Sequence, residues 1–334
     1  MTAKRIAQGR WIGVALAITL GAGMWAQAPA TPKTTAKPSA KTAAKPSAKT
    51  LKQPAAAKAK TPPPPPPEPE LLQYARRADW LKVEAMVAGG ADVNVKNSHG
   101  WTTLMLATQG GRDEVVKLLL TRGADPNAAT DTGETSLMQA AQNAYAPIAA
   151  QLIAKGANVN AQAKDGTNAL MLAAHRPVLD VVKLLLGKGA DLALKDARGW
   201  STLLYASDGG DLNVVQALLV KGADVNAAAS DGITPLMNAA EKDNLNTVLL
   251  FLAKGAQVNA TSSGGHTALM SAAAKGNAEV VQALLAKGAD AGMKDSTSKT
   301  ALDMAADAHQ AGAVELLMRT ATVAPKAPSS EPSK

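Results

Sequence analysis

The chain has 334 residues, 46% of them hydrophobic, with a formal net charge of +8 and no cysteine. One Phe, three Tyr and five Trp are too few to fill a large α/β core, so the core must be built from Ala, Leu, Val and Met. The absence of cysteine excludes disulfides, thiolate metal sites and cysteine nucleophiles.

The positive charge is concentrated in the N-terminal part of the chain. Residues 1–70 hold 11 Lys/Arg against 2 Asp/Glu, whereas the remaining residues hold 24 against 25. Because the body is nearly neutral and its sequence shows no basic stripe, the composition argues against a nucleic-acid-binding domain. We therefore expect no nucleic acid among the partners.

The first 30 residues have the pattern of a secretory signal peptide. A basic start is followed by an apolar run over residues 11–25, which is shorter than the roughly 20 residues that a membrane span needs. The small residues Ala28 and Ala30 favour cleavage before Thr31, and cleavage after Ala28 is the second site. The sequence predicts an exported protein, with the periplasm as the first expectation. Secretion, or anchoring in the membrane by an uncleaved signal, is the alternative.

Residues 31–70 read as a disordered linker rich in Lys, Ala and Pro. The seven-residue unit 36–42 recurs at 44–50, and six consecutive prolines occupy 62–67. Such a segment cannot bury enough apolar surface to offset its ordering entropy, and a proline run favours the stiff polyproline II conformation. One interpretation is a spacer whose lysines make weak contact with an anionic envelope surface. The other is a plain soluble linker.

From residue 71 onward the chain repeats itself every 33 residues, which predicts a repeat architecture. Three residue types mark the register: a Leu, an Ala three positions later, and two glycines. One Leu per unit defines eight units over residues 71–320. This Leu ladder consists of Leu71, Leu104, Leu137, Leu170, Leu203, Leu236, Leu269 and Leu302. The Ala ladder consists of Ala107, Ala140, Ala173, Ala206, Ala239, Ala272 and Ala305. Residues 321–334 are expected to form a disordered tail.

Unit 6 shows what each repeat encodes. Thr234 is a candidate N-cap and Pro235 suits the first helical position, which predicts a first helix ending at about Lys242. A second helix is expected over residues 247–254, and Gly255 ends it because helix ends favour the left-handed conformation. No unit buries its apolar face alone, so the units must stack.

This pattern resembles the ankyrin repeat. The motif residues are Gly-Ile-Thr-Pro-Leu at 232–236 and Gly-Ala-Asp-Val-Asn at 222–226, and they recur over about 250 of the 334 residues. The resemblance implies a mainly α-helical solenoid of antiparallel helix pairs. It also implies a β-hairpin finger projecting from each unit, with the first and last units acting as caps.

The sequence departs from the family at one position of each unit. The family usually has His after the Thr-Pro-Leu, whereas this chain mostly has Met. We interpret this Met stripe as core filler between units rather than as a binding surface. Its members are Met105, Met138, Met171, Met237 and Met270, with Leu204 and Asp303 in the two remaining units.

We find no pattern typical of catalysis. The four His fall in different units, and none has a second His or carboxylate at ligand spacing. No glycine loop of the phosphate-binding type precedes a Lys. We expect a non-enzymatic protein without cofactor or metal.

In the ankyrin family, finger tips and inner helices line the face that holds the partner. The candidate binding residues are those that vary at these positions: Trp101, Leu106, Glu134, Gln139, Leu172, Trp200, Tyr205, Ile233, Asn238 and His266. Trp200 and Tyr205, read as exposed aromatic anchors in one unit, form the expected hot spot. The alternative is that Trp101 and Trp200 only pack over neighbouring fingers.

The leading functional hypothesis is a non-catalytic protein–protein interaction module or scaffold in the cell envelope. We expect it to be a monomer that binds a protein partner on its concave face. The alternatives are a secreted effector that binds host proteins and a passive structural element of the envelope. The long linker favours the envelope, since an effector gains little from a spacer.

Overall fold

A computed structural model describes residues 68–176 and 178–323. The predicted signal peptide (1–30), the linker up to residue 67 and the tail from 324 onward lie outside these residues. The first described helix begins at Glu70, next to the expected boundary, and the last ends at Val323, three residues beyond it.

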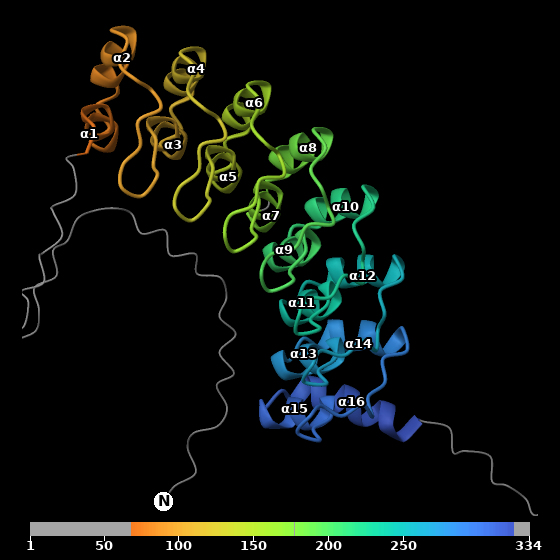
Figure 1. Ribbon diagram of the computed structural model, residues 1–334. Helices are drawn as coiled ribbons and strands as arrows, with labels where there is room; N and C mark the ends of the chain where they lie inside the picture. Colours follow the sequence, from red (N-terminus) through yellow and green to blue (C-terminus); the bar gives the residue numbers. More distant parts are fainter. Residues whose placement is uncertain (1–67, 177, 324–334) are drawn as a thin grey trace, which may run out of the picture. The chain divides into compact units, whose positions relative to one another are not determined.

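The described residues form sixteen helices in eight consecutive pairs (Figure 1). The first helix of each pair has seven or eight residues. These inner helices are α1 (Glu70–Arg76), α3 (Thr103–Gln109), α5 (Ser136–Gln142), α7 (Ala169–His175), α9 (Thr202–Gly209), α11 (Pro235–Glu241), α13 (Ala268–Lys275) and α15 (Ala301–Asp307).

The second helix of each pair has nine residues, except the last, which has 13. These outer helices are α2 (Trp80–Ala88), α4 (Asp113–Thr121), α6 (Ala146–Ala154), α8 (Leu179–Gly187), α10 (Leu212–Val220), α12 (Leu245–Ala253), α14 (Ala278–Ala286) and α16 (Ala311–Val323). None of the described helices is long and apolar enough to cross a membrane.

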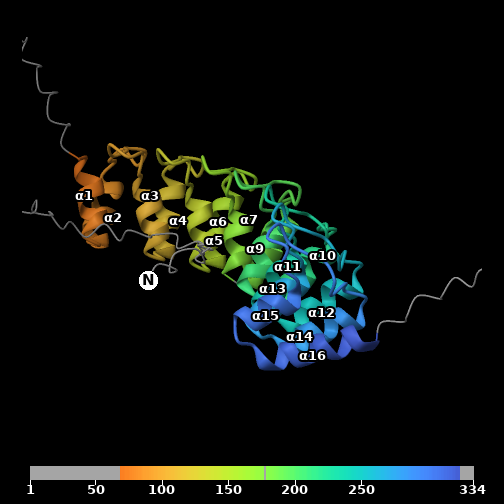
Figure 2. The same ribbon diagram turned by 90° about the horizontal axis from the view of Figure 1, so that it is seen from below.

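Inner helices stack on inner helices and outer helices on outer helices, so the repeat array has two layers (Figures 1 and 2). Each finger follows the outer helix of one pair and leads into the inner helix of the next. This arrangement confirms the mainly α-helical solenoid of stacked repeat units.

Capping side chains determine where the helices begin. Thr234 Oγ1 accepts a hydrogen bond from Met237 N at 3.3 Å and Pro235 is the first helical residue, as predicted. Such a cap contributes about 1 kcal/mol. The same contact opens seven inner helices through Thr102, Thr135, Asn168, Ser201, Thr234, Thr267 and Thr300. The outer helix α12 begins two residues earlier than predicted, because Asn244 caps it by accepting from Thr247 N.

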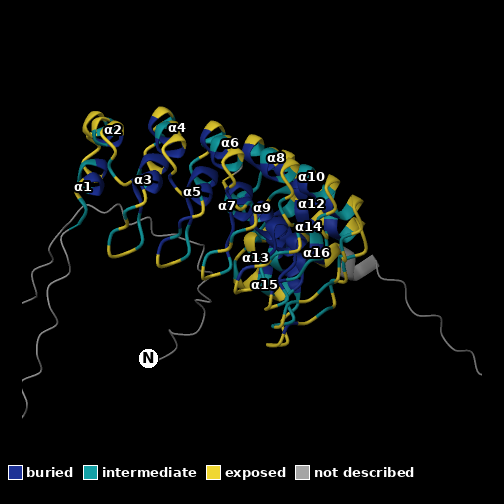
Figure 3. Cartoon of the chain, turned by 45° about the horizontal axis from the view of Figure 1, so that its top comes forward, coloured by how far each residue is buried: buried dark blue, intermediate teal, exposed yellow. Residues whose placement is uncertain are grey.

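The core runs through the array at the residues that repeat. The whole Ala ladder lacks exposed surface, because these small side chains stand where inner helices of adjacent units meet. The five Met of the Met stripe and Leu204 are buried too, which confirms them as core filler. Figure 3 shows the buried residues where helices face one another and exposed residues along the outer helices.

A glycine occupies the turn of the finger in units 2 to 7, because two constraints meet there. Gly166 has a φ of +81°, which L side chains rarely adopt, and a Cβ on it would lie 2.7 Å from Asp196 Cα in the next finger. In the last unit Ser298 occupies this position with a φ of 65°. Because no further finger follows, only the backbone conformation constrains that residue.

The fingers are shorter than full β-hairpins. In the described residues their arms meet only in isolated antiparallel bridges: Lys96 with Thr102, Ala129 with Thr135, Gln162 with Asn168, and Lys195 with Ser201. Neighbouring fingers are joined by backbone hydrogen bonds instead, such as Ala197 N to Asp165 O at 2.8 Å. The finger row is therefore held together between units as well as within them.

A second row of contacts links the segments that follow the outer helices of adjacent units, and we call each such contact an Asn bridge. Asn160 Nδ2 donates to Gly189 O at 3.2 Å, and Asn160 Oδ1 accepts from Asp191 N at 2.8 Å. The residues at this position are Asn94, Asn127, Asn160, Asn226 and Asn259. Ala193 stands there in unit 4, so the junction of units 4 and 5 lacks the bridge.

The end units expose polar side chains, as expected of caps. Arg76, Arg77 and Asp79 are exposed in the first unit. In the last unit Asp303 is exposed and forms a capping box with Thr300.

Candidate protein-interaction surface

The finger of unit 5 is shaped by the carboxylate of Asp196. Its Oδ1 accepts hydrogen bonds from Arg198 N at 2.9 Å and from Trp200 N at 2.8 Å. An Asp side chain that binds its own backbone in this way stabilises a tight turn. Asn97 does the same in unit 2, where its Oδ1 accepts from Trp101 N at 3.0 Å.

Four side chains of unit 5 form the Trp200 cluster: Asp196, Arg198, Trp200 and Tyr205. The Arg198 guanidinium carbon lies 4.6 Å from the centre of the Trp200 ring. Asp196 Oδ2 accepts hydrogen bonds from Arg198 Nη2 at 3.0 Å and from Tyr205 Oη at 2.9 Å. The Trp200 and Tyr205 rings meet edge to face at 5.6 Å.

Within the cluster, Tyr205 is buried, whereas Arg198 and Trp200 are accessible to solvent. Tyr205 is only 3% exposed, so the expectation of an exposed Tyr205 anchor is wrong. Burial, and then the charge of Asp196, raise the pKa of the Tyr205 phenol. The Arg198 side chain is 44% exposed and Trp200 is half-buried. Arg198 is not among the binding residues predicted from the sequence. Its position two residues before Trp200 in the same finger is the pattern that could have indicated it.

Hydrogen bonding keeps Arg198 in place. Burial lowers the pKa of its guanidinium, but the hydrogen bond to Asp196 and the neighbouring Tyr205 raise it, so that the net shift is upward. No hydrogen bond of Arg198 Nη1 is found in the part of the chain that the structure describes. One edge of the cation is therefore open to a partner's carbonyl or carboxylate.

The other predicted finger residues are spread along the row. Trp101, Glu134 and His266 are half-buried, whereas Ile233 is buried. Burial, and then the charge of Asp165, raise the pKa of Glu134. His266 Nε2 lies 3.5 Å from the buried carboxylate of Asp295.

The predicted inner-helix residues divide into two kinds. Leu106 and Leu172 are half-buried and contribute to the surface. Gln139 and Asn238 are buried. Asn238 Nδ2 donates to Leu204 O at 3.4 Å and to Ser207 Oγ at 3.3 Å, so it joins α11 to α9. Asn238 thus links units, and it offers little surface to a partner.

A row of charged contacts connects the ends of the inner helices. Asp208 Oδ2 lies 3.4 Å from His175 Nδ1, and Asp208 Oδ1 lies 2.8 Å from Lys242 Nζ. Lys275 Nζ lies 3.3 Å from Glu241 one unit further on. We call these five residues the charged row. The mixed charges at 175, 208 and 241, one period apart, were the sequence signal for it.

The described residues contain no group of three or more His, Cys, Asp or Glu side chains arranged to hold a metal ion. The surface carries groups suited to binding another molecule: the Trp200 ring, the Arg198 cation and the charged row. The repeated helical scaffold holds each of them in place.

These features define a repeat protein that presents variable side chains on a regular helical frame. A family model described as ankyrin repeats (3 copies) matches overlapping stretches at residues 51–130, 71–163, 137–229, 170–262, 203–295 and 236–327. The chain belongs to the ankyrin repeat family. Proteins of this family are generally non-catalytic modules for protein–protein interaction. No curated protein matches the chain.

Proposed function

We propose that this chain is a non-catalytic interaction module of the cell envelope, which binds a protein partner through its fingers and inner helices. The Trp200 cluster is the centre of the contact. Family membership supports the class of function, since ankyrin repeats generally mediate protein–protein interactions.

The stack of Arg198 on Trp200 is the observation that carries this proposal. Trp and Arg are the residues most enriched among binding hot spots. Here both are held before any partner arrives, because Asp196 binds both backbones and the Arg198 side chain. A preorganised anchor loses less conformational entropy on binding. The partner surface should present a carbonyl or carboxylate to Arg198 and an apolar group to Trp200.

The test compares two fingers of the same chain. Partners are crosslinked in the native envelope and identified, and their capture by purified variants is measured. We expect Arg198→Ala with Trp200→Ala to abolish capture, and Trp101→Ala, in the equivalent finger of unit 2, to retain most of it. Tyr205 is left unchanged because it is buried and its removal would perturb the fold.

Circular dichroism and thermal unfolding must show that the double variant is folded. If the folded double variant captures the partner as well as the wild type does, the Trp200 cluster is not the anchor. If the Trp101 variant loses capture equally, the contact is spread over the fingers and has no centre in unit 5.

The location in the envelope rests on the signal-peptide pattern of residues 1–30. Fractionation of cells that express the full chain tests it. Recovery from the periplasm supports the proposal, and recovery from the membrane pellet indicates an uncleaved anchor. Recovery mainly from the culture medium would favour the secreted effector.

A further inference from the structure

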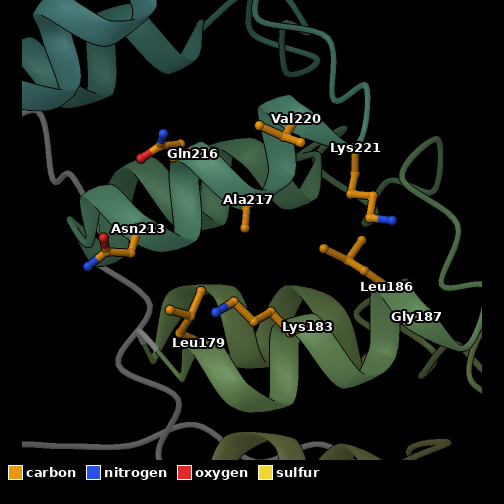
Figure 4. A pocket seen from close by; sticks show the side chains of 9 residues that line it. All are labelled: Leu179, Lys183, Leu186, Gly187, Asn213, Gln216, Ala217, Val220 and Lys221. Carbon is orange, nitrogen blue, oxygen red and sulfur yellow. The ribbon is translucent and has the colours of Figure 1, made fainter.

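An open groove lies on the outer layer, between α8 of unit 4 and α10 of unit 5 (Figure 4). Its volume is about 420 Å³. Leu179 and Leu186 line it from α8, and Ala217 and Val220 line it from α10. The groove is on the outer helices and the Trp200 cluster is on a finger of the inner layer, so the two surfaces are distinct (Figure 1).

Three departures from the repeat coincide at this junction. Gly187 ends α8 where other outer helices have a larger residue, and a Cβ on it would meet nothing within 4 Å. Val220, at the same position of α10, is 73% exposed. Ala193 replaces the asparagine of the Asn bridge. Breaks in an otherwise regular scaffold are where function is expected.

The inner layer of the same junction is close-packed. A Cβ on Gly209 of α9 would overlap the carbonyl oxygen of His175 and lie 3.0 Å from Ala174 O, both in α7. The two inner helices therefore touch through backbone, whereas the two outer helices leave the groove between them.

The groove combines the apolar side chains named above with the uncharged polar side chains of Asn213 and Gln216, and its charge is positive. Lys183 and Lys221 are its only charged lining residues, both are exposed, and no carboxylate lines it. Neither lysine forms an ion pair within the described residues. In Figure 4 the Lys183 amine extends toward Leu179, whereas Lys221 lies beside Val220 near the other end of the groove. An occupant that matches this pattern has an apolar face with carboxylates near both ends.

We propose that the groove is a second docking site, for a short amphipathic helix of a partner protein with acidic residues flanking its apolar face. A small molecule would leave much of its surface in water in so open a groove, whereas its sites usually bury most of it. A helix laid along two neighbouring helices buries only its apolar stripe, which is the usual mode of helix-in-groove recognition.

The test is a selection followed by matched variants of the full chain. Random 16-residue peptides displayed on phage are selected on the wild-type protein, and the enriched peptides are synthesised. We expect them to combine a helical apolar stripe with Asp or Glu near both of its ends. Val220→Asp, and Lys183→Glu with Lys221→Glu, should each weaken their binding at least about tenfold, or 1.4 kcal/mol.

The control is Leu249→Asp on α12, because Leu249 is also an exposed apolar residue, at 43%, but lies outside the groove. This variant should bind the peptides as the wild type does. Both sites are exposed, so thermal unfolding should be nearly unchanged in both aspartate variants.

Three results would overturn the proposal: no enriched peptide depends on Val220, the enriched peptides are basic, or the peptides lose binding on Trp200→Ala instead. Binding of the wild type and the Val220→Asp variant to vesicles of phosphatidylglycerol is measured separately. If they bind in a Val220-dependent manner and the peptides do not, the groove is a lipid site. Binding that depends on Val220 reports on the groove and binding that depends on Trp200 reports on the finger, so the two proposals can fail separately.

Discussion

Gly166 and Gly222 share a positive φ but have different surroundings. A Cβ on Gly166 would strike the backbone of the next finger, whereas a Cβ on Gly222 would meet nothing within 4 Å. The left-handed conformation costs an L residue about 1–2 kcal/mol at either position. Only at Gly166 is a second cost added, because the neighbouring finger has to move.

We therefore expect Gly166→Ala to lower the free energy of unfolding by about 1–2 kcal/mol more than Gly222→Ala does. Urea unfolding of the two variants measures the difference. Equal losses would mean that the fingers shift freely and that only the backbone conformation constrains these glycines.

The Tyr205 phenol provides a pH-dependent signal at the residue scale. Its pKa is raised above the ordinary 10.0 by burial and by Asp196. A raised pKa favours the neutral phenol in the folded state, so this stabilisation is complete below pH 10 and is lost as the pH rises through the folded pKa.

Absorbance at the tyrosinate band, followed with rising pH, should show one of the three tyrosines titrating late, together with loss of the fold. The Tyr205→Phe variant should lack this late step. A late step that persists in the variant would assign it to another tyrosine.

At the scale of elements, the Asn bridges hold consecutive units together at the base of the fingers, where the chain leaves the outer helices. The bridge made by Asn160 consists of two hydrogen bonds between exposed groups. Each such bond contributes about 0.5–1.5 kcal/mol. The junction of units 4 and 5 lacks this contribution because it has Ala193.

Ala193→Asn should restore a bridge to unit 5 and raise the unfolding midpoint, and Asn160→Ala should lower it by an amount equivalent to about 1–2 kcal/mol. Thermal unfolding of both variants checks the pair. A loss of stability in Ala193→Asn would show that the backbone at this junction does not suit the bridge.

At the scale of the whole molecule, a repeat array unfolds cooperatively as long as each interface is strong enough to couple its neighbours. The interface of units 4 and 5 combines a close backbone contact at Gly209 in the inner layer with a groove at the surface of the outer layer. A side chain at Gly209 would force α9 away from α7.

We expect Gly209→Ala to split unfolding into two transitions, one for α1–α8 and one for α9–α16. Gly187→Ala, in the open groove of the same junction, should instead stabilise by about 0.5–1 kcal/mol through helix propensity. Hydrogen exchange followed by mass spectrometry resolves the two halves. A single transition in Gly209→Ala would place the weak point elsewhere in the array.

The 33-residue period by itself determined the helix pairs, their caps and the buried ladders. Capping, helix propensity and apolar spacing depend on residues close together in the chain, so they can be recognised within each unit. Because the same pattern recurs in every unit, a position that is ambiguous in one unit is assigned from the others. The Met stripe could be assigned to the core for the same reason. The placement of Trp200 on a finger also followed from the register.

Only the tertiary structure decided which variable residues are accessible. Tyr205 and Asn238 occupy positions that the register marks as variable, yet both are buried through contacts with other elements. The stack of Arg198 on Trp200 and the groove beside Val220 depend on side-chain volumes and on backbone approaches between residues one unit apart. Those contacts are properties of the packed array, and a periodic pattern read along one chain does not contain them.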